Sequence, residues 1–198
     1  MIAKYTIFLL LSVLFWSCQT KRQFDTLVKS IRTISTPASI DSSFFAKSLE
    51  YEKVSLKKID KKFEGYFNIE DLAEKHGEKF LFEKYFFGKI SINEDVVAIL
   101  IYAPRNREIP LDALVERIYL ITFNKVTGKP IDSLPIASYE SHFDTEIVTE
   151  CYLFNNQKIR TKQTKYFLDE TDNWTLQHSD SSEYHISMSG KINNTSQN

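Results

Sequence analysis

The residues best suited to metal chemistry are His142, Asp144 and Glu146, in the stretch SHFDTEI. They alternate along the chain, so one continuous β-strand here would put all three side chains on one face. An imidazole and two carboxylates form a donor set that suits Zn²⁺ or Mn²⁺. Three alternating polar residues are also ordinary on a solvated sheet face. We therefore expect no bound metal. A hydrolase or metal-dependent enzyme that uses these three residues is the alternative to a non-catalytic protein.

Other catalytic signatures are missing from the sequence. It contains no Walker loop, dinucleotide fingerprint, Cys-x-x-Cys pair, His-Glu-x-x-His motif or Gly-x-Ser-x-Gly elbow. The formal net charge is −1, with basic residues scattered among acidic ones, so a nucleic-acid surface is not expected. The sequence predicts no cofactor and favours a non-catalytic protein.

The amino-terminal segment has the three-part layout of a secretory leader. Lys4 precedes an apolar run from Tyr5 to Trp16, and the small Ser17 follows it. As a helix the run is about 18 Å long, whereas roughly 20 residues are needed to span a bilayer. We predict a signal peptide over residues 1–17, with an uncleaved signal anchor as the alternative.

Cys18 comes directly after this leader. Residues 14–18, LFWSC, resemble the lipobox of bacterial lipoproteins. The resemblance implies cleavage before Cys18, lipid on its thiol and acylation of the new amino terminus. Several acyl chains, at about 0.8 kcal/mol per buried CH₂, hold a protein more durably than one chain. The second cysteine, Cys151, then has no partner for a disulfide, and its apolar surroundings predict a small buried side chain.

Residues 18–40 are predicted to be a tether between the lipid and the folded domain. Their composition is polar, and we expect flexible chain over at least the first ten residues. Apolar residues from Phe24 to Ile31 nevertheless have a spacing that could support one short helix. A second short helix is predicted over Asn68 to His76, where Asn68 can cap the first turn.

Residues 41–198 are predicted to form a single mainly β domain. Segments rich in aromatic and β-branched residues follow one another with no long helical pattern between them, which indicates an antiparallel meander forming an open sheet, a sandwich or a partial barrel. The run VVAILIYA predicts a strand buried on both faces. The stretch KIRTKQTKYF is more polar and predicts an exposed or edge strand. The predicted strands cover residues 80–92, 96–103, 117–123, 130–139, 146–154, 158–167, 173–178 and 184–190.

The leader ending in Ser17-Cys18, the hairpin TFNKVTGKPIDSL and the terminal YHISMSGKI together resemble uncharacterised Bacteroidetes lipoproteins. This resemblance implies an envelope protein held in the membrane by lipid on Cys18, and it implies no particular activity. Gln-Thr-Lys-Arg follows Cys18. In enterobacterial lipoproteins, which this leader resembles, an Asp directly after the Cys is linked to retention in the inner membrane, and it is missing here. The acidic run that is linked to surface display in Bacteroidetes is missing as well. We expect the periplasmic face of the outer membrane, and a binding or assembly role with an envelope protein partner.

Overall fold

A computed structural model describes residues 21–49, 56–60, 63, 84–104 and 113–196. The fold is mainly β, as predicted, and the strands form one antiparallel sheet. Residues 21–30 are helical and precede the first strand. The remaining elements are β1 (Ala38–Ile40), α2 (Ser42–Leu49), β2 (Lys57–Lys58), β3 (Tyr85–Ser91), β4 (Val96–Ala103), β5 (Ala113–Asn124), β6 (Pro130–His142), β7 (Thr145–Leu153), β8 (Lys158–Leu168), β9 (Trp174–Ile186) and β10 (Ile192–Asn194).

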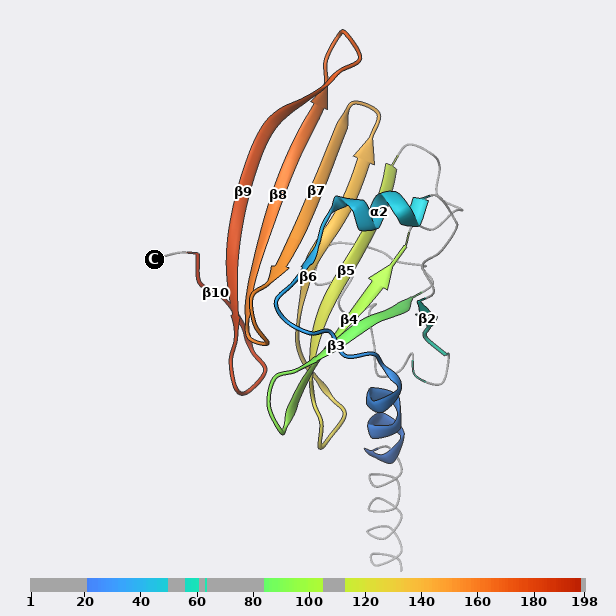
Figure 1. Ribbon diagram of the computed structural model, residues 1–198, viewed down its shortest axis with the longest axis vertical. Helices are drawn as coiled ribbons and strands as arrows, with labels where there is room; N and C mark the ends of the chain where they lie inside the picture. The colour runs from blue at the N-terminus through green and yellow to red at the C-terminus, as the bar shows by residue number, and fades with distance from the viewer. Residues whose placement is uncertain (1–20, 50–55, 61–62, 64–83, 105–112, 197–198) are drawn as a thin grey trace, which may run out of the picture.

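The sheet is a meander in which each strand from β2 to β10 pairs with its neighbour in sequence (Figure 1). Short connections therefore alternate between two ends of the molecule. We call one the helix end, because it carries the helix of residues 21–30 together with the β3–β4, β5–β6, β7–β8 and β9–β10 turns. The other is the hairpin end, which carries the β6–β7 and β8–β9 turns.

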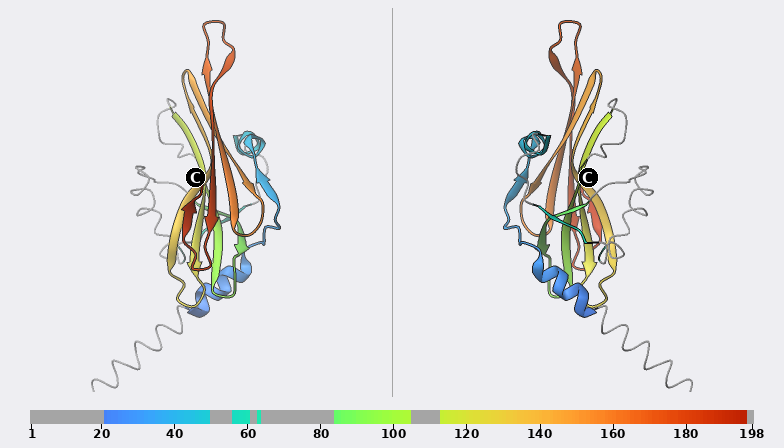
Figure 2. Two further views of the ribbon diagram at one scale, coloured as in Figure 1. Left: turned by 90° about the vertical axis from the view of Figure 1, so that its left-hand side faces the viewer. Right: turned by 90° about the vertical axis from the view of Figure 1, so that its right-hand side faces the viewer.

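Near the helix end the sheet becomes two layers, because β6 parts from β7. The two strands pair only between Ser138 and Thr149 and the turn that joins them. Beyond this point β1 takes the place of β6, with Ile40 opposite Cys151. The β9–β10 turn then reaches back across to β5, where the Thr122 hydroxyl donates a 2.7 Å hydrogen bond to the Gly190 carbonyl. The two layers separate visibly in Figure 2.

Two buried clusters fill the molecule, one on each face of β4. All eight residues of β4 are buried, which confirms the prediction of a strand covered on both faces. Ile99 belongs to the cluster under the helix of residues 21–30, and Leu100 belongs to the cluster between the two layers. Adjacent residues of a strand point to opposite faces, so each cluster takes alternate side chains of this strand.

The flexible tether predicted after Cys18 is wrong from residue 21 onward, and the short helix that the spacing of Phe24 to Ile31 could support is confirmed over residues 21–30. Phe24 and Leu27 of the helix, and Ile31 directly after it, are buried together in the first cluster. Their spacing of three to four residues is that of an amphipathic helix, and burying this face, with Val28 partly buried beside it, stabilises a segment whose remaining residues are polar. The domain therefore includes the helix and β1, and its first described residue, Lys21, comes three positions after Cys18.

Two strand predictions also need correction. β8, predicted to be an exposed or edge strand, is not at the edge, since β7 and β9 pair with it on either side. The other option is confirmed, because its polar alternate residues lie on an exposed face. The two strands predicted over 173–178 and 184–190 are one strand, β9, and its turn. The helix predicted over Asn68 to His76 lies outside the described residues. None of the helices that the structure describes is long and apolar enough to cross a membrane.

Candidate partner-binding site

The three candidate metal ligands do not converge. His142 ends β6 opposite Thr145, whereas Glu146 in β7 is opposite Ser141. His142 and Glu146 therefore belong to adjacent cross-strand residue pairs, and their side chains point to opposite faces of the sheet. Asp144 lies in the turn between them. The chain reverses at residues 143–144, so the alternation expected of a single strand is lost, and the described residues contain no cluster of three metal-ligating side chains.

Glu146 instead faces Tyr139, the side chain that stacks on Phe45 of α2 with ring centroids 6.4 Å apart. Burial raises the pKa of the Glu146 carboxyl, and its hydrogen bond with Tyr139 acts in the opposite direction. Burial also raises the pKa of the Tyr139 hydroxyl. Glu146 is thus a partner of Tyr139, the residue that packs against α2.

Cys151 is fully buried in the cluster between the layers, as predicted. Burial raises the pKa of its thiol to about 12. A thiol in this state is neutral near pH 7 and is a poor nucleophile. The only cysteine among the described residues therefore has a packing role.

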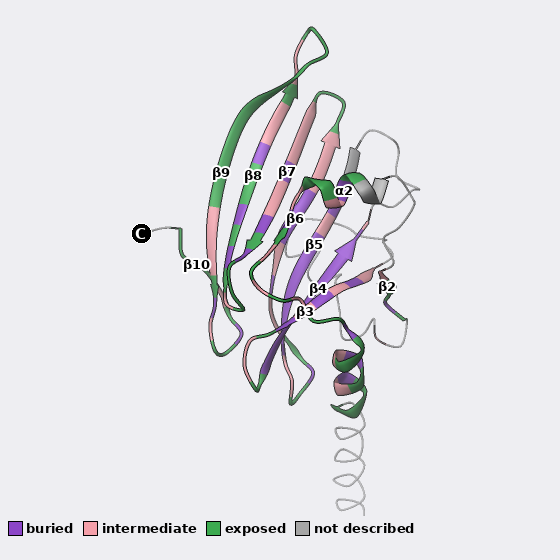
Figure 3. Ribbon diagram, in the orientation of Figure 1, coloured by how far each residue is buried: buried purple, intermediate pink, exposed green. Residues whose placement is uncertain are grey.

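The most accessible part of the sheet is its β9 edge. Residues 174–181 are exposed, and Figure 3 shows most of this strand in the exposed class. β10 covers only the far end of β9, where it pairs with residues Tyr184 to Ile186. We call residues 174–182 the open edge, because no described strand pairs with their outer side.

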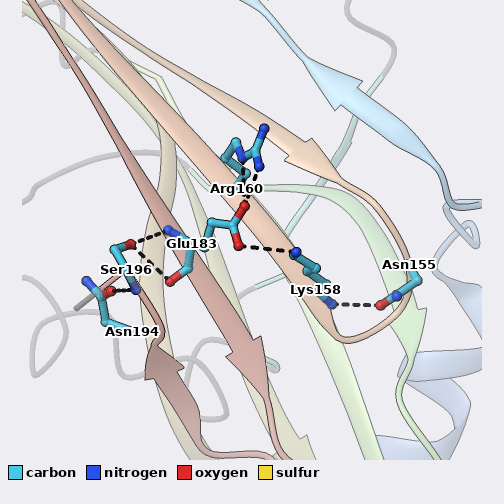
Figure 4. Close-up of polar contacts among 6 residues, drawn as sticks. All are labelled: Asn155, Lys158, Arg160, Glu183, Asn194 and Ser196. Atoms are coloured by element: carbon cyan, nitrogen blue, oxygen red, sulfur yellow. Dashed lines mark hydrogen bonds and ion pairs between the residues drawn. The ribbon is translucent and has the colours of Figure 1, made fainter. Parts of the chain in front are cut away.

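The boundary of the open edge is set by the carboxyl-terminal residues (Figure 4). The backbone N–H of Glu183 donates a 2.5 Å hydrogen bond to the Ser196 hydroxyl, and its carbonyl accepts a 2.8 Å bond from Thr195. Both backbone groups of Glu183 thus point away from β8. Strand alternation gives Ser181 and Ser179 the same outward orientation, so these two residues present backbone donors and acceptors that a further strand could pair with.

The side chain of Glu183 is held by two basic residues of β8. Its carboxylate accepts hydrogen bonds from Arg160 of β8, one of them 2.9 Å long, and forms a 3.2 Å ion pair with Lys158 (Figure 4). These cations lower the pKa of the Glu183 carboxyl. These contacts join β9 to β8 next to the open edge. The open edge is therefore supported by β8 on the side away from solvent.

A polar groove of about 410 Å³ adjoins the open edge. It is formed across β5 to β9, and its lining is dominated by hydroxyl, carboxamide and charged groups. Arg117 donates a 2.8 Å hydrogen bond to Glu140, and the Ser138 hydroxyl donates a 3.1 Å bond to Thr149. The lining residues are Arg117, Pro135, Ala137, Ser138, Glu140, Thr149, Thr161, Gln163, Asp180, Ser182 and Tyr184.

This lining can recognise a polar ligand by hydrogen bonds, but its described contacts do not pair a nucleophile with a base. Asp180, Ser182 and Tyr184 belong to β9 itself. A strand added to the open edge would therefore lie next to the groove, and its alternate side chains would face it. The edge and the groove together form a surface suited to an extended peptide.

Large apolar side chains are exposed at the hairpin end, one in the β6–β7 turn and three beside the β8–β9 turn. Phe143 is 80 % exposed and Leu176 is 64 % exposed, and Phe167 and Trp174 are partly exposed. Exposed aromatic residues of this kind are typical of protein interfaces. Trp174 and Leu176 belong to the open edge itself, and Phe167 lies beside them in β8, so the candidate surface includes apolar side chains next to the β8–β9 turn.

The sequence reasoning missed this edge for a physical reason. The stretch QHSDSSE, residues 177–183, has no apolar residue at alternate positions, so it looks like a loop between two strands. The structure pairs residues 178–183 with β8 and leaves Gln177 at a shift in register, and neither face of the stretch needs an apolar covering. The chain matches no protein-family model, no curated protein and no solved structure.

Proposed function

We propose that this protein is a lipid-anchored envelope lipoprotein on the periplasmic face of the outer membrane, and that it binds another envelope protein without catalysing a reaction. The lipobox-like residues 14–18 support the anchor. The observation that carries the binding role is the open edge of β9, which presents outward backbone groups at Ser179 and Ser181. Adding a partner strand to such an edge is a common mode of peptide recognition.

The positions of the anchor and of the open edge agree with this role. Cys18 precedes Lys21 by three residues, which span at most about 11 Å. Lys21 begins the described helix at the helix end, and the β8–β9 hairpin lies at the opposite end (Figure 1). A lipid on Cys18 would hold the helix end at the membrane and direct the hairpin end away from it.

The anchor is tested by Cys18→Ser. The serine oxygen cannot carry a thioether-linked lipid, so the variant should accumulate as an uncleaved or soluble precursor. Metabolic labelling with a radioactive fatty acid should mark the wild type and leave the variant unlabelled. Equal labelling of both would refute the lipid attachment, and digestion of the domain by protease on intact cells would refute the periplasmic placement.

The binding role is tested at Ser181. Its N–H points outward, so Ser181→Pro removes a donor from the edge and leaves the pairing of β9 with β8 intact. A partner that co-purifies stoichiometrically with the wild type from detergent-solubilised envelopes should be lost with this variant. Ser181→Ala, which keeps the backbone donor, is the matched control and should retain the partner. A partner that stays bound to a folded Ser181→Pro protein would exclude strand addition at this edge.

A further inference from the structure

The helix end also exposes large apolar side chains, and each comes from a different turn. Val126 in the β5–β6 turn is 52 % exposed, Phe154 in the β7–β8 turn is 44 % exposed, and Met188 in the β9–β10 turn is 64 % exposed. Together with the four residues of the hairpin end and Tyr152, these are the large apolar residues exposed in the described part of the chain. Such residues are therefore concentrated at the ends of the sheet.

The turns of the helix end form one connected surface. Lys125 of the β5–β6 turn donates a 2.5 Å hydrogen bond to the Asn93 carbonyl in the β3–β4 turn. The Asn93 side chain in turn donates a 2.7 Å bond to the Met188 carbonyl in the β9–β10 turn. These bonds hold Val126 and Met188 in fixed positions relative to each other. The β7–β8 turn joins the same network, since Asn156 donates a 2.9 Å bond to the Ser91 carbonyl.

The helix of residues 21–30 is part of the same surface. A β-carbon on Gly128, in the β5–β6 turn, would lie 3.1 Å from the Phe24 ring, so the turn packs directly against the helix. The outer face of the helix carries three exposed basic residues, Lys21, Arg22 and Lys29.

The turns themselves add charge of both signs to this surface. Lys129 and Lys191 are exposed on the β5–β6 and β9–β10 turns, and the acidic Glu94 and Asp95 are exposed on the β3–β4 turn. Basic side chains around exposed apolar tips are the usual composition of a surface that lies on a membrane.

From this arrangement we propose that the helix end contacts the lipid surface directly, with Val126 and Met188 in the interfacial layer and the basic side chains near lipid phosphates. The proposal rests on the proposed anchoring through Cys18. The short chain between Cys18 and Lys21 is the reason to expect lipid against this surface. Three residues reach at most about 11 Å, whereas the polar layer on one side of a bilayer is roughly 5–8 Å thick. A chain this short keeps the helix end at the headgroups.

Site-specific fluorescence on the full lipidated chain, reconstituted into vesicles of phosphatidylcholine with phosphatidylglycerol, tests this contact. Val126→Cys and, separately, Met188→Cys would carry an environment-sensitive dye, and Ser181→Cys on the open edge is the matched control. Cys151 is buried and Cys18 carries the lipid, so the dye should react at the introduced thiol. We expect blue-shifted emission at 126 and 188, and quenching by aqueous iodide at least about threefold weaker than at 181.

Flotation of the vesicles separates the two proposals. If the chain floats with the vesicles and the dyes at 126 and 188 are quenched as strongly as the dye at 181, the anchor holds and the surface contact is wrong. If the chain does not float, the anchor fails and the contact fails with it. Protection at 126 and 188 in the floating fraction, with the dye at 181 accessible, supports the contact.

Discussion

The aromatic rings of Phe24 and Phe123 pack with their centroids 5.4 Å apart and their planes tilted by 41°. Phe24 belongs to the first described helix, and Phe123 lies near the end of β5. Both side chains are fully buried. This contact joins the segment that follows Cys18 to the middle of the sheet, so the helix is a structural part of the domain.

Phe24→Ala is therefore expected to destabilise the folded chain by about 3–5 kcal/mol, because it removes a large buried side chain and leaves a cavity under the helix. Gln23→Ala, at an exposed position of the same helix, is the control and should change the free energy of unfolding by less than about 0.5 kcal/mol. Urea denaturation followed by circular dichroism measures both. A flexible tether, as the sequence suggested, would make the two substitutions equally harmless.

The difference between the predicted tether and the observed helix has a clear origin. The helical spacing of Phe24, Leu27 and Ile31 was visible in the sequence, but an isolated helix of this length is only marginally stable in water. What fixes it is the apolar surface of β4 and β5 beneath it, and no local pattern reveals that surface. The meander itself was predictable, because the strand patterns and the short connections are local properties of the chain.

A second prediction concerns β4, whose adjacent residues Ile99 and Leu100 lie in different buried clusters. Ile99→Asp and Leu100→Asp each place an unpaired carboxylate in one of the two cores, so each should cost more than about 4 kcal/mol and abolish the folded state. Lys162→Asp, at an exposed position of β8, is the control and should fold. A native far-UV spectrum and a cooperative thermal transition in either β4 variant would contradict this account of the core.

The candidate site was less predictable than the core. Alternation suggested that His142 and Glu146 share a face, but that inference holds only within one strand, and the reversal at Asp144 cancels it. The open edge depends on which strand is last in the sheet and on how much of it β10 covers. Both are properties of long-range pairing, and a polar strand such as β9 gives little local signal of either.

The buried thiol of Cys151 gives a chemical prediction. Its pKa is raised to about 12 by burial, so the reactive thiolate is scarce at pH 8. In a Cys18→Ser background, the folded chain should react with an aromatic disulfide reagent at least about a hundredfold more slowly than the chain unfolded in guanidinium. Equal rates in the two states would mean that the layers near Cys151 open readily.

Glu146 makes a pH-dependent contribution to stability. Burial raises the pKa of its carboxyl above the ordinary value of 4.5, so the folded chain binds this proton more tightly than the unfolded chain does. The free energy of unfolding should therefore fall as the pH rises from about 4.5 through the folded pKa.

The Glu146→Gln variant tests this contribution. Its side chain cannot ionise, and its amide oxygen can still accept a hydrogen bond from Tyr139. The variant should be more stable than the wild type at pH 7, and this advantage should disappear near pH 4. Thermal melts between these pH values measure the difference, with Glu170→Gln in the exposed β8–β9 turn as the control. If the Glu146→Gln variant stays more stable than the wild type by the same amount at pH 4, packing and not ionisation accounts for the difference in stability.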